Sequence, residues 1–440
     1  MTEKKRVGVI SLGCDKNRVD TEKMLAHTKQ KHELVDDIEC AEIIVINTCA
    51  FLESAREEAI SEIFSANEYK KQGSAKKIIV TGCLPQKFIG ELFDELIEVD
   101  GFLGVADYDH INQVIEKVLN GERVNAVGQN LAECGKERVL TTDNYAYLKI
   151  ADGCSNHCTY CLIPYIRGKY RSVPTADLIE ETKGLGNVNE LILVAQDTAR
   201  YGQDLTPQTS LAQLIRKLSK LDNVNSIRLM YCYPENLTEE LIREIKENDK
   251  VIKYVDIPLQ HADDKVLKLM NRKGTGQSYL ELIERLKSEI PQIAIRSTFI
   301  TGFPRESEQA FENLVEFIKK AKLFNAGFFA YSREEGTPAY KLDGQIEESV
   351  KQKRLKKLYA VQKKVVQKIN ESFIGKEIDI VAEGFDNDEM VYFGRAYFNA
   401  PDIDGKVYFT STDDIVVNQG EVYTVKITKA TNYDLYGRVV

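Results

Sequence analysis

The chain has 440 residues, which exceeds the usual size of a single hydrophobic core and predicts two or three domains. Its formal net charge of −9 argues against a protein that lives on phosphate backbones. No run of about 18 uncharged apolar residues occurs, and no apolar signal-peptide core follows the basic N-terminal residues. We therefore expect a soluble, cytoplasmic protein with no membrane segment, in which nine cysteines indicate metal ligands or redox groups rather than disulfides.

Residues 1–135 alternate Val/Ile-rich runs with amphipathic helical stretches. The expected strands are 7–14, 41–49 and 76–83, and the expected helices are 20–30, 52–69 and 88–99. This alternation predicts an N-terminal α/β domain, with a parallel sheet covered on both faces. Each strand ends in a cysteine: Cys14, Cys49 and Cys83. Because the carboxyl ends of parallel strands meet at one edge, we expect these thiols to converge in space.

Residues 145–345 predict a second α/β domain after a polar connector. Candidate strands lie at 147–151, 190–195, 225–231, 252–258, 293–300 and 325–332, and helical stretches such as 210–221, 237–248 and 278–290 separate them. Six units are too few for the eight-stranded closed barrel. We therefore expect a partial (βα)6 barrel with its site at the carboxyl ends of the strands.

The end of the chain changes character twice. Residues 346–371 predict one long lysine-rich connecting helix, for which a nucleic-acid contact and a solvated face are both open. Residues 372–440 contain short strand-like runs between Gly, Asp and Asn turns, which predicts a small antiparallel β-barrel. This part has six Lys/Arg and twelve Asp/Glu, so its formal charge is 6 − 12 = −6. Such a barrel repels phosphate.

Three cysteines, Cys154, Cys158 and Cys161, lie in the stretch "GCSNHCTYCLI", directly after the first strand of the partial barrel. One alternative is a zinc site that includes His157 as a fourth ligand. Three thiolates in one loop at a barrel mouth fit an iron–sulfur cluster better. A cubane cluster with three cysteine ligands keeps one iron open, and that opening provides a position for a substrate or cofactor.

"CSNHCTYC" resembles the signature of radical S-adenosylmethionine enzymes, whose six-unit partial barrel matches the strand count above. The whole chain, from "SLGCDKN" through "INTC", "TGCLPQ" and "DGCSNHCTYCLIPYIRGKYRS" to a TRAM-like barrel, resembles the methylthiotransferases. The resemblance implies two 4Fe-4S clusters, the first on Cys154, Cys158 and Cys161 and the second on Cys14, Cys49 and Cys83. S-adenosylmethionine would bind the first cluster and sulfur the second. The implied reaction replaces an unactivated C–H by C–S–CH3 through a deoxyadenosyl radical and consumes two S-adenosylmethionine molecules.

Further residues at strand ends are expected to contact the cofactor. Gln196 ends the second strand of the partial barrel, Gln260 and His261 end the fourth, and Gly302 and Pro304 follow the fifth. The alternatives are helix capping for the polar residues and a simple turn for the glycine and proline.

Other residues near these motifs have two interpretations. Arg167, Lys169 and Arg171 follow the cysteine loop and either hold a carboxylate or lie on a solvated surface. Arg305 stands where the family often has glycine, so this loop departs from the family pattern. The three cysteines outside the two sets are expected to be ordinary free thiols: Cys40, Cys134 and Cys232.

The substrate is expected to be a protein. "YVDIPLQHADDKVLKLMNR", "FFAYSREEGTPAY" and "GRAYFNAPDIDGKVYF" resemble the RimO branch, which modifies the β-carbon of an aspartate in small-subunit ribosomal protein S-twelve. The tRNA branch has a serine-glycine pair where Gln260 and His261 stand. An acidic barrel would also attract a basic ribosomal protein and repel tRNA. A tRNA methylthiotransferase and an iron–sulfur electron carrier remain alternatives, and the enzyme requires an electron donor of the reductase or flavodoxin type.

Overall fold

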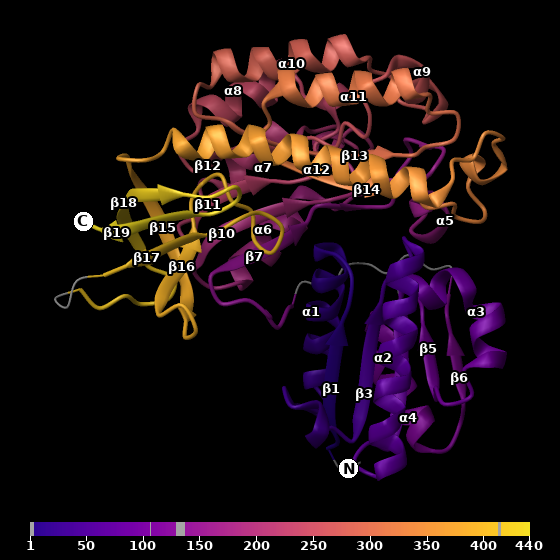
Figure 1. The fold of residues 1–440 in the computed structure, drawn as a ribbon. Helices are drawn as coiled ribbons and strands as arrows, with labels where there is room; N and C mark the ends of the chain where they lie inside the picture. Colours follow the sequence, from indigo (N-terminus) through magenta and orange to yellow (C-terminus); the bar gives the residue numbers. More distant parts are fainter. Residues whose placement is uncertain (1–3, 106, 129–136, 412–414) are drawn as a thin grey trace.

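The computed structural model of the protein describes residues 4–105, 107–128, 137–411 and 415–440. These residues form a parallel sheet, a curled parallel sheet and a small barrel in chain order (Figure 1). Within this part of the chain, no helix combines the length and apolarity that a membrane crossing requires.

The N-terminal sheet has, among the described residues, six parallel strands in the order β2-β1-β3-β4-β5-β6. They are β1 (Arg6–Ser11), β2 (Glu33–Leu34), β3 (Ile43–Thr48), β4 (Lys77–Gly82), β5 (Gly101–Leu103) and β6 (Val124–Ala126), and the helices are α1 (Asp15–Lys29), α2 (Glu53–Gln72), α3 (Cys83–Glu95) and α4 (Ile111–Leu119). Alternate residues of β3 face opposite cores: Ile44 packs with α2 and α3, whereas Val45 packs with α1 and α4. This confirms the predicted sheet covered on both faces.

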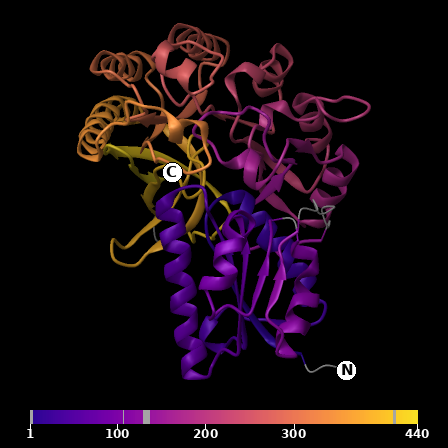
Figure 2. The same ribbon diagram turned by 90° about the vertical axis from the view of Figure 1, so that its right-hand side faces the viewer.

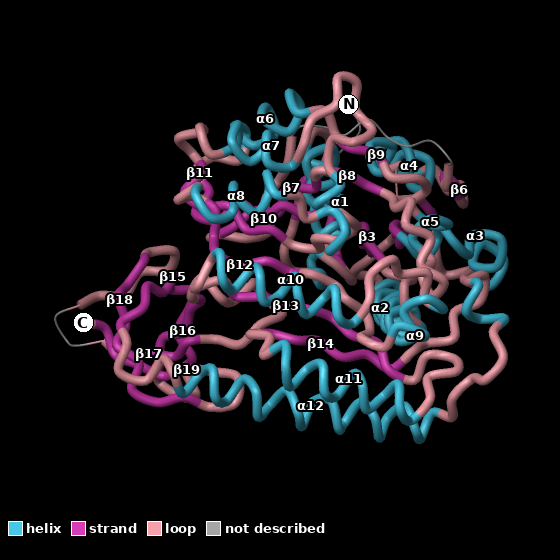
Figure 3. Tube along the Cα trace, turned by 90° about the horizontal axis from the view of Figure 1, so that it is seen from above, coloured by secondary structure: helices cyan, strands magenta, loops and turns pink. Residues whose placement is uncertain are grey.

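The central sheet has six parallel strands in the order β14-β13-β12-β11-β10-β7 within the described chain, and it confirms the predicted half-barrel. Its strands are β7 (Tyr145–Lys149), β10 (Val188–Val194), β11 (Val224–Leu229), β12 (Val251–Asp256), β13 (Ala294–Thr301) and β14 (Asn325–Ala330). Its helices are α6 (Thr175–Gly184), α7 (Leu211–Leu218), α8 (Glu239–Glu247), α9 (Asp264–Leu269), α10 (Gly276–Glu289) and α11 (Glu308–Ala321). Figure 3 shows the helices along the outside of the curled sheet.

Short elements complete the half-barrel. The hairpin β8 (Ala151–Asp152) and β9 (Arg171–Ser172) encloses the loop with three cysteines, which also contains α5 (Ile163–Ile166). Single 3₁₀ turns lie at Ile38–Cys40, Tyr108–His110, Thr198–Arg200, Pro234–Asn236 and Pro338–Lys341.

Helix α12 (Glu348–Glu371) is the predicted long helix, and it packs along α11 and β14 (Figure 3). It leads into a closed barrel with the order β15-β16-β17-β19-β18. The strands are β15 (Glu377–Asp386), β16 (Val391–Arg395), β17 (Val407–Thr410), β18 (Val422–Ala430) and β19 (Leu435–Val439). The predicted small barrel is confirmed, with one refinement: β17 and β19 pair in parallel, whereas the other neighbours are antiparallel.

The three bodies pack against one another. Figures 1 and 2 show the N-terminal sheet below the half-barrel and the C-terminal barrel at its side. Tyr147 and Ile192 of the half-barrel share a core with Phe398 and Phe409 of the C-terminal part. The C-terminal part is therefore packed on the half-barrel through a shared apolar core.

Candidate functional site

Three cysteines follow neighbouring strands of the N-terminal sheet, and we call Cys14, Cys49 and Cys83 the N-terminal cysteine set. The strand order 2-1-3-4-5 places a topological switch point at β1 and β3, where ligands of open parallel sheets bind. The loops after these two strands touch, because a Cβ added to Gly13 would lie 2.8 Å from the Cβ of Cys49. The structure thus brings the three thiols to one sheet edge, where negative charge on Cys14 or Cys49 would act to raise the pKa of Cys83.

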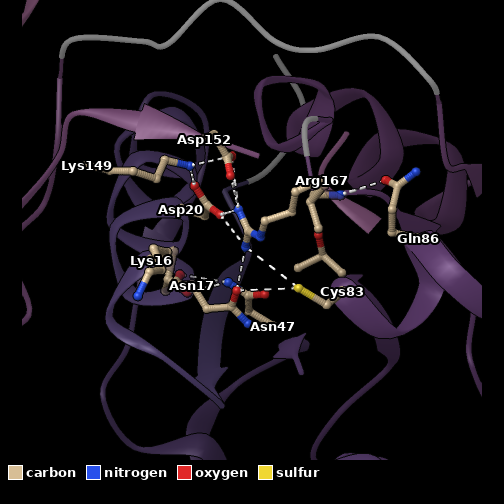
Figure 4. Close-up of polar contacts among 12 residues, drawn as sticks. Lys16, Asn17, Asp20, Asn47, Cys83, Gln86, Lys149, Asp152 and Arg167 are labelled. Carbon is tan, nitrogen blue, oxygen red and sulfur yellow. Dashed lines mark hydrogen bonds and ion pairs between the residues drawn. The ribbon is translucent and has the colours of Figure 1, made fainter. Parts of the chain in front are cut away.

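Asn17, in the first turn of α1, ties these loops together (Figure 4). Its Nδ2 donates to the carbonyl of Leu12 at 3.2 Å and to the carbonyl of Thr48 at 3.0 Å, which precede the first and second cysteines of the set. The Sγ of Cys83 lies 3.8 Å from the Asn17 Oδ1. One buried amide therefore contacts all three cysteine loops.

Burial disfavours the free thiolate at two members of the N-terminal cysteine set, Cys49 and Cys83, whereas Cys14 is exposed. Burial raises the pKa of the Cys83 thiol to about 12, although the neighbouring Arg167 guanidinium acts to lower it. Burial also raises the pKa of Cys49. Cluster ligands are thiolates, so a bound iron–sulfur cluster would supply the positive partner that these sites otherwise lack. The donor set of three adjacent thiols therefore fits a cluster.

The loop between β8 and β9 carries the second set, and we call Cys154, Cys158 and Cys161 the loop cysteine set. The backbone N–H of Cys161 donates to the carbonyl of Cys158 at 3.1 Å, so the last two cysteines share a tight turn. The Sγ of Cys158 lies 3.0 Å from the Tyr233 Oη. Burial raises the pKa of Cys154 to about 11 and raises that of Cys161 as well.

The zinc alternative requires His157 as a ligand, and this residue is exposed, with a φ of 50°. Among the described residues, no three His, Cys, Asp or Glu side chains lie close enough to hold a single metal ion. In a cubane, each thiolate binds a different iron, so the three sulfur atoms do not converge on one point.

Polar groups from the end of β10 lie beside the loop cysteine set. The Nε2 of Gln196 donates to Asp152 at 3.1 Å, and its Oε1 is buried without a hydrogen-bond partner among the described residues. Asp197 accepts hydrogen bonds from Asn156 at 3.0 Å and Asn236 at 2.8 Å, but its Oδ1 has no partner in the same part of the chain. Burial raises the pKa of Asp197. The sequence indicated Gln196 and missed Asp197, although both stand at the same strand end.

A cavity of about 200 Å³ lies between the loop cysteine set and the N-terminal domain. Its lining includes Phe51, Tyr160, Gln260, Ile300 and Tyr331. The walls are mostly apolar, and they come from the loop after β3, the cysteine loop and the ends of the fourth, fifth and sixth strands of the half-barrel. The structure therefore puts Gln260 at the predicted mouth, beside residues that the sequence did not single out.

His261 does not lie at this mouth. Its side chain is 0% exposed, its Nδ1 accepts from the N–H of Asp263 at 2.9 Å, and its Nε2 lies 3.0 Å from Glu306. Arg354 of α12 also binds Glu306, at 2.8 Å. Both ring nitrogens are thus occupied by protein groups, so the expected direct contact between His261 and a cofactor is corrected to a supporting role behind the strand end.

Gly302 and Pro304 are both buried after β13. A Cβ on Gly302 would lie 2.4 Å from the Cγ of Lys351 in α12, and its φ is +76°. The packing of a helix and the positive φ therefore both require a glycine here, and the approach of Gly302 and Pro304 to a cofactor stays a prediction.

The three cations after the cysteine loop differ from one another. Arg167 is buried and binds carboxylates, but these belong to Asp20 and Asp152 of the protein itself. Lys169 is exposed, and Arg171 donates to the Lys169 carbonyl at 2.7 Å. Arg167 therefore holds carboxylates, as one of the two interpretations predicted, but these are side chains of the protein itself.

The remaining residues that the sequence singled out are Arg305 and the three cysteines outside the two sets. Arg305 is exposed, has a φ of 66° and pairs with Asp343. Cys40 is exposed and Cys232 is buried, whereas Cys134 lies outside the described residues.

A second cavity, of about 320 Å³, opens at Cys14 where the three bodies meet. Its lining includes Arg18 after the first turn of α1, Tyr147 and Tyr231 of the half-barrel and Asp402 of the C-terminal barrel. Arg18 and Asp402 face each other across the rim at 3.6 Å. All three parts of the chain therefore shape the space around the first cysteine.

Three family models match the chain. Residues 148–318 match the radical SAM superfamily, residues 6–104 match an uncharacterized protein family, UPF0004, and residues 374–440 match the TRAM domain. Among solved structures, the radical S-adenosylmethionine methyltransferase TsrM from Kitasatospora setae aligns with a TM-score of 0.56 at 12% identity, over 77% of each chain. The radical enzyme OxsB aligns with a TM-score of 0.52 at 14% identity, over 82% of this chain and 56% of OxsB. The fold and the three-cysteine loop thus define a radical SAM protein, a class that implies a 4Fe-4S cluster and S-adenosylmethionine as cofactors.

More similar relatives cover the whole chain. "Ribosomal protein uS12 methylthiotransferase RimO" from Acetivibrio thermocellus is 46% identical over 99% of both chains. The proteins of the same name from Thermoanaerobacter sp. (98% of this chain, 99% of the relative) and Clostridium botulinum strain Eklund 17B (99% and 98%) are 46% and 45% identical. The chain belongs to the RimO family of methylthiotransferases.

Proposed function

We propose that the protein is a radical S-adenosylmethionine methylthiotransferase whose substrate is ribosomal protein uS12, the small-subunit protein S-twelve. It replaces a C–H on the β-carbon of an aspartate by C–S–CH3 and consumes two S-adenosylmethionine molecules per product. The observation that carries this proposal is the pair of three-cysteine sets on adjoining edges of two parallel sheets, in a chain whose full-length relatives are named uS12 methylthiotransferases.

Each cysteine set would hold one 4Fe-4S cluster, which makes two clusters per chain. When bound, these groups supply the one-electron chemistry and the sulfur atom that no side chain provides. One thiol of each set is buried, Cys83 in the N-terminal set and Cys158 in the loop set, whereas Cys14 is exposed. The loop cysteine set would serve S-adenosylmethionine cleavage, and the N-terminal cysteine set would serve sulfur insertion.

The cavity of about 200 Å³ beside Tyr160 fits the adenosine part of S-adenosylmethionine, because its walls are mostly apolar and it adjoins the loop cysteine set. The unpartnered oxygens of Gln196 and Asp197 fit the amino group of its methionine part, since buried acceptors that lack a donor among the described residues favour a cationic donor. Gln260 would contact the cofactor from the same cavity.

The cavity at Cys14 fits the substrate side chain, because it lies beside the N-terminal cysteine set and opens between the three bodies. The C-terminal barrel supplies one wall and carries a formal charge of 6 − 12 = −6 over residues 372–440. Ribosomal proteins are generally basic, so this charge would steer uS12 toward the cavity and would oppose tRNA.

The remaining partners follow from this chemistry. An electron donor of the reductase or flavodoxin type would reduce the clusters, and uS12 would be modified in the cytoplasm, free or on the ribosome. No described side chain supplies the electron, so an external donor is required by the reaction itself.

The test is anaerobic reconstitution with iron and sulfide, followed by incubation with reductant, S-adenosylmethionine and either uS12 or anticodon-loop RNA. We expect mass spectrometry to find one methylthio group on an aspartate of uS12. Modification of the RNA alone would assign the chain to the tRNA branch. Clusters that show no spectral response to S-adenosylmethionine would assign it to the electron carriers.

A further inference from the structure

Arg167 lies between the two cysteine sets and is buried, with a side-chain exposure of 2%. It follows α5 and is six residues beyond Cys161, yet its guanidinium reaches into the N-terminal domain (Figure 4). Its NH2 group donates to the Oδ1 of Asn17 at 2.6 Å and lies 3.7 Å from the Sγ of Cys83. The next residue, Gly168, accepts the backbone N–H of Cys154 at 3.1 Å. A single side chain therefore links the polypeptide of one set to a thiol of the other.

The contact to Asn17 extends this link. Asn17 donates through its Nδ2 to the carbonyls of Leu12 and Thr48, which precede Cys14 and Cys49, while its Oδ1 accepts from Arg167. An amide that has both its oxygen and its nitrogen engaged cannot rotate without loss of several hydrogen bonds. The position of Arg167 is thus transmitted to the loops of the whole N-terminal cysteine set.

The charges of this cluster balance. Arg167 binds Asp20 at 3.1 Å and Asp152 at 3.0 Å, and Lys149 also binds both carboxylates. Two cations therefore face two carboxylates, all in the interface between the N-terminal domain and the half-barrel. Arg167 presents its guanidinium to the Sγ of Cys83 (Figure 4).

We propose that Arg167 is a positioning residue for the cluster on the N-terminal cysteine set: it fixes the spacing between the two sets and raises the reduction potential of that cluster. The physical basis is that a positive charge and an N–H donor beside a ligand sulfur stabilise the reduced, more negative form of a cluster. Asn17 carries the positioning part of this role to the other two loops. The inference rests on the proposed function, because it requires that this set holds a cluster.

The test measures the midpoint potential of that cluster by anaerobic titration followed by electron paramagnetic resonance. The full chain is used with Cys154, Cys158 and Cys161 replaced by alanine, so that only the N-terminal cluster titrates. Arg167→Gln should shift the midpoint to a more negative value, whereas Arg167→Lys, which keeps the charge, should restore most of the shift. A residue that only supports folding would not move the potential in this charge-dependent way.

The matched control is Arg228→Gln. Arg228 is equally buried and pairs with Glu190, but it lies on β11 against the C-terminal barrel and has no contact with either cysteine set among the described residues. We expect this variant to lose stability without a shift in potential. If Arg167→Gln does not fold, the double variant Asp20→Asn/Arg167→Gln keeps Lys149 paired with Asp152. Its shift should be negative but smaller than that of Arg167→Gln, because the lost carboxylate offsets part of the lost positive charge while the N–H donor to Cys83 is still removed.

The outcomes separate the two proposals. A chain with the intact N-terminal set that binds no iron and sulfide after reconstitution would overturn the second cluster of the proposed function, and the inference with it. A chain that binds the cluster, but whose potential in Arg167→Gln equals that of Arg228→Gln, would overturn the inference alone. An equal negative shift in Arg167→Lys and Arg167→Gln would overturn the assigned role of the charge.

Discussion

Individual residues divide the site into two environments. The N-terminal cysteine set lies against a cation, Arg167, whereas the loop cysteine set lies beside the Tyr233 hydroxyl and the buried Asp197 carboxylate. A guanidinium beside a ligand sulfur favours extra negative charge on a bound cluster, whereas a buried carboxylate opposes it. Two clusters of the same composition would therefore have different potentials.

Cys49→Ala tests this division at the level of one thiol. The variant removes one ligand from the N-terminal cysteine set and leaves the loop set, so S-adenosylmethionine cleavage should persist while methylthio product falls by about 100-fold or more. Chromatography of 5′-deoxyadenosine and mass spectrometry of uS12 report the two activities. Cys40→Ala, an exposed cysteine in the same domain, is the control and should change neither. Loss of cleavage in Cys49→Ala would contradict separate roles.

The two cysteine sets could be predicted from local signals, because three cysteines end strands and three share one loop. The contact between Asn17 and Arg167 could not be predicted, since the hydrogen bond that joins them spans 150 residues and depends on how two domains pack. His261 shows the opposite failure. A polar residue at a strand end satisfies the pattern for a site, but only the fold reveals that Glu306 and Asp263 occupy both of its ring nitrogens.

At the scale of elements, helix α12 stabilises the turn that follows β13 of the half-barrel. Lys351 covers Gly302 after β13, and its Nζ donates to the Tyr331 carbonyl at 2.9 Å. Arg354, one turn further along, binds Glu306, which also accepts the N–H of Gly302. Ile300 lines the cavity of about 200 Å³, and two cations of one helix thus stabilise the turn that follows it.

Gly302→Ala tests this support. The φ of +76° costs an alanine about 1 to 2 kcal/mol, and its Cβ would in addition press on Lys351 at 2.4 Å. The melting temperature of the apo protein should fall, and S-adenosylmethionine should bind more weakly. Gly186→Ala is the control, because it has a φ of +73° with no atom within 4 Å of the added Cβ. An equal fall in both variants would show that conformation alone is responsible and that the helix contact contributes nothing.

In the two parallel sheets, the length of a strand decided whether the sequence predicted it. Strands β1, β3, β4 and the six of the half-barrel were predicted, because each has five or more residues with a clear apolar run. Strands β2, β5 and β6 have two or three residues and escaped notice, since so short a segment carries no period. Helix α1 begins at Asp15, whereas the sequence predicted a start at residue 20. The apolar pattern missed the first turn because its buried residues, Lys16 and Asn17, are polar, and Asn17 contacts the loop of Cys49.

At the scale of the molecule, the C-terminal barrel is joined to the half-barrel by more than a linker. Phe398 and Phe409 share a core with Tyr147 and Ile192, and Asp402 lines the cavity at Cys14. Deletion of the barrel would expose this core, so its part in substrate binding is better tested by substitutions at exposed acidic positions. The C-terminal barrel carries the acidic charge and also supplies one wall of the cavity at Cys14. Under the proposed function, the same domain would attract the basic substrate and help to place it.

An ion triad at this junction allows a pH-dependent prediction. Glu190 of β10 binds Arg228 of β11 and, at 2.8 Å, Arg395 of the barrel. Burial acts to raise the Glu190 pKa, but the two guanidinium groups outweigh it and hold the pKa below its usual value. A lowered pKa means that the triad stabilises the fold above about pH 4.3, the ordinary value for glutamate, and that this contribution is lost as the pH falls further.

Glu190→Gln should therefore destabilise the apo protein by about 3 kcal/mol at pH 7, since it leaves two buried guanidinium groups without their anion. The difference from the parent protein should start to shrink as the pH falls below about 4.3, and it should be lost once the pH passes the lowered pKa that Glu190 has in the fold. Melting temperatures of the variant and the parent protein, at pH 7 and at a pH below about 4, measure this difference. Glu240→Gln, which breaks an exposed pair with Arg216, should change little at either pH, because solvent screens such a pair. A loss in Glu190→Gln that is the same at both pH values would mean that shape, and not charge, holds the barrel to the half-barrel.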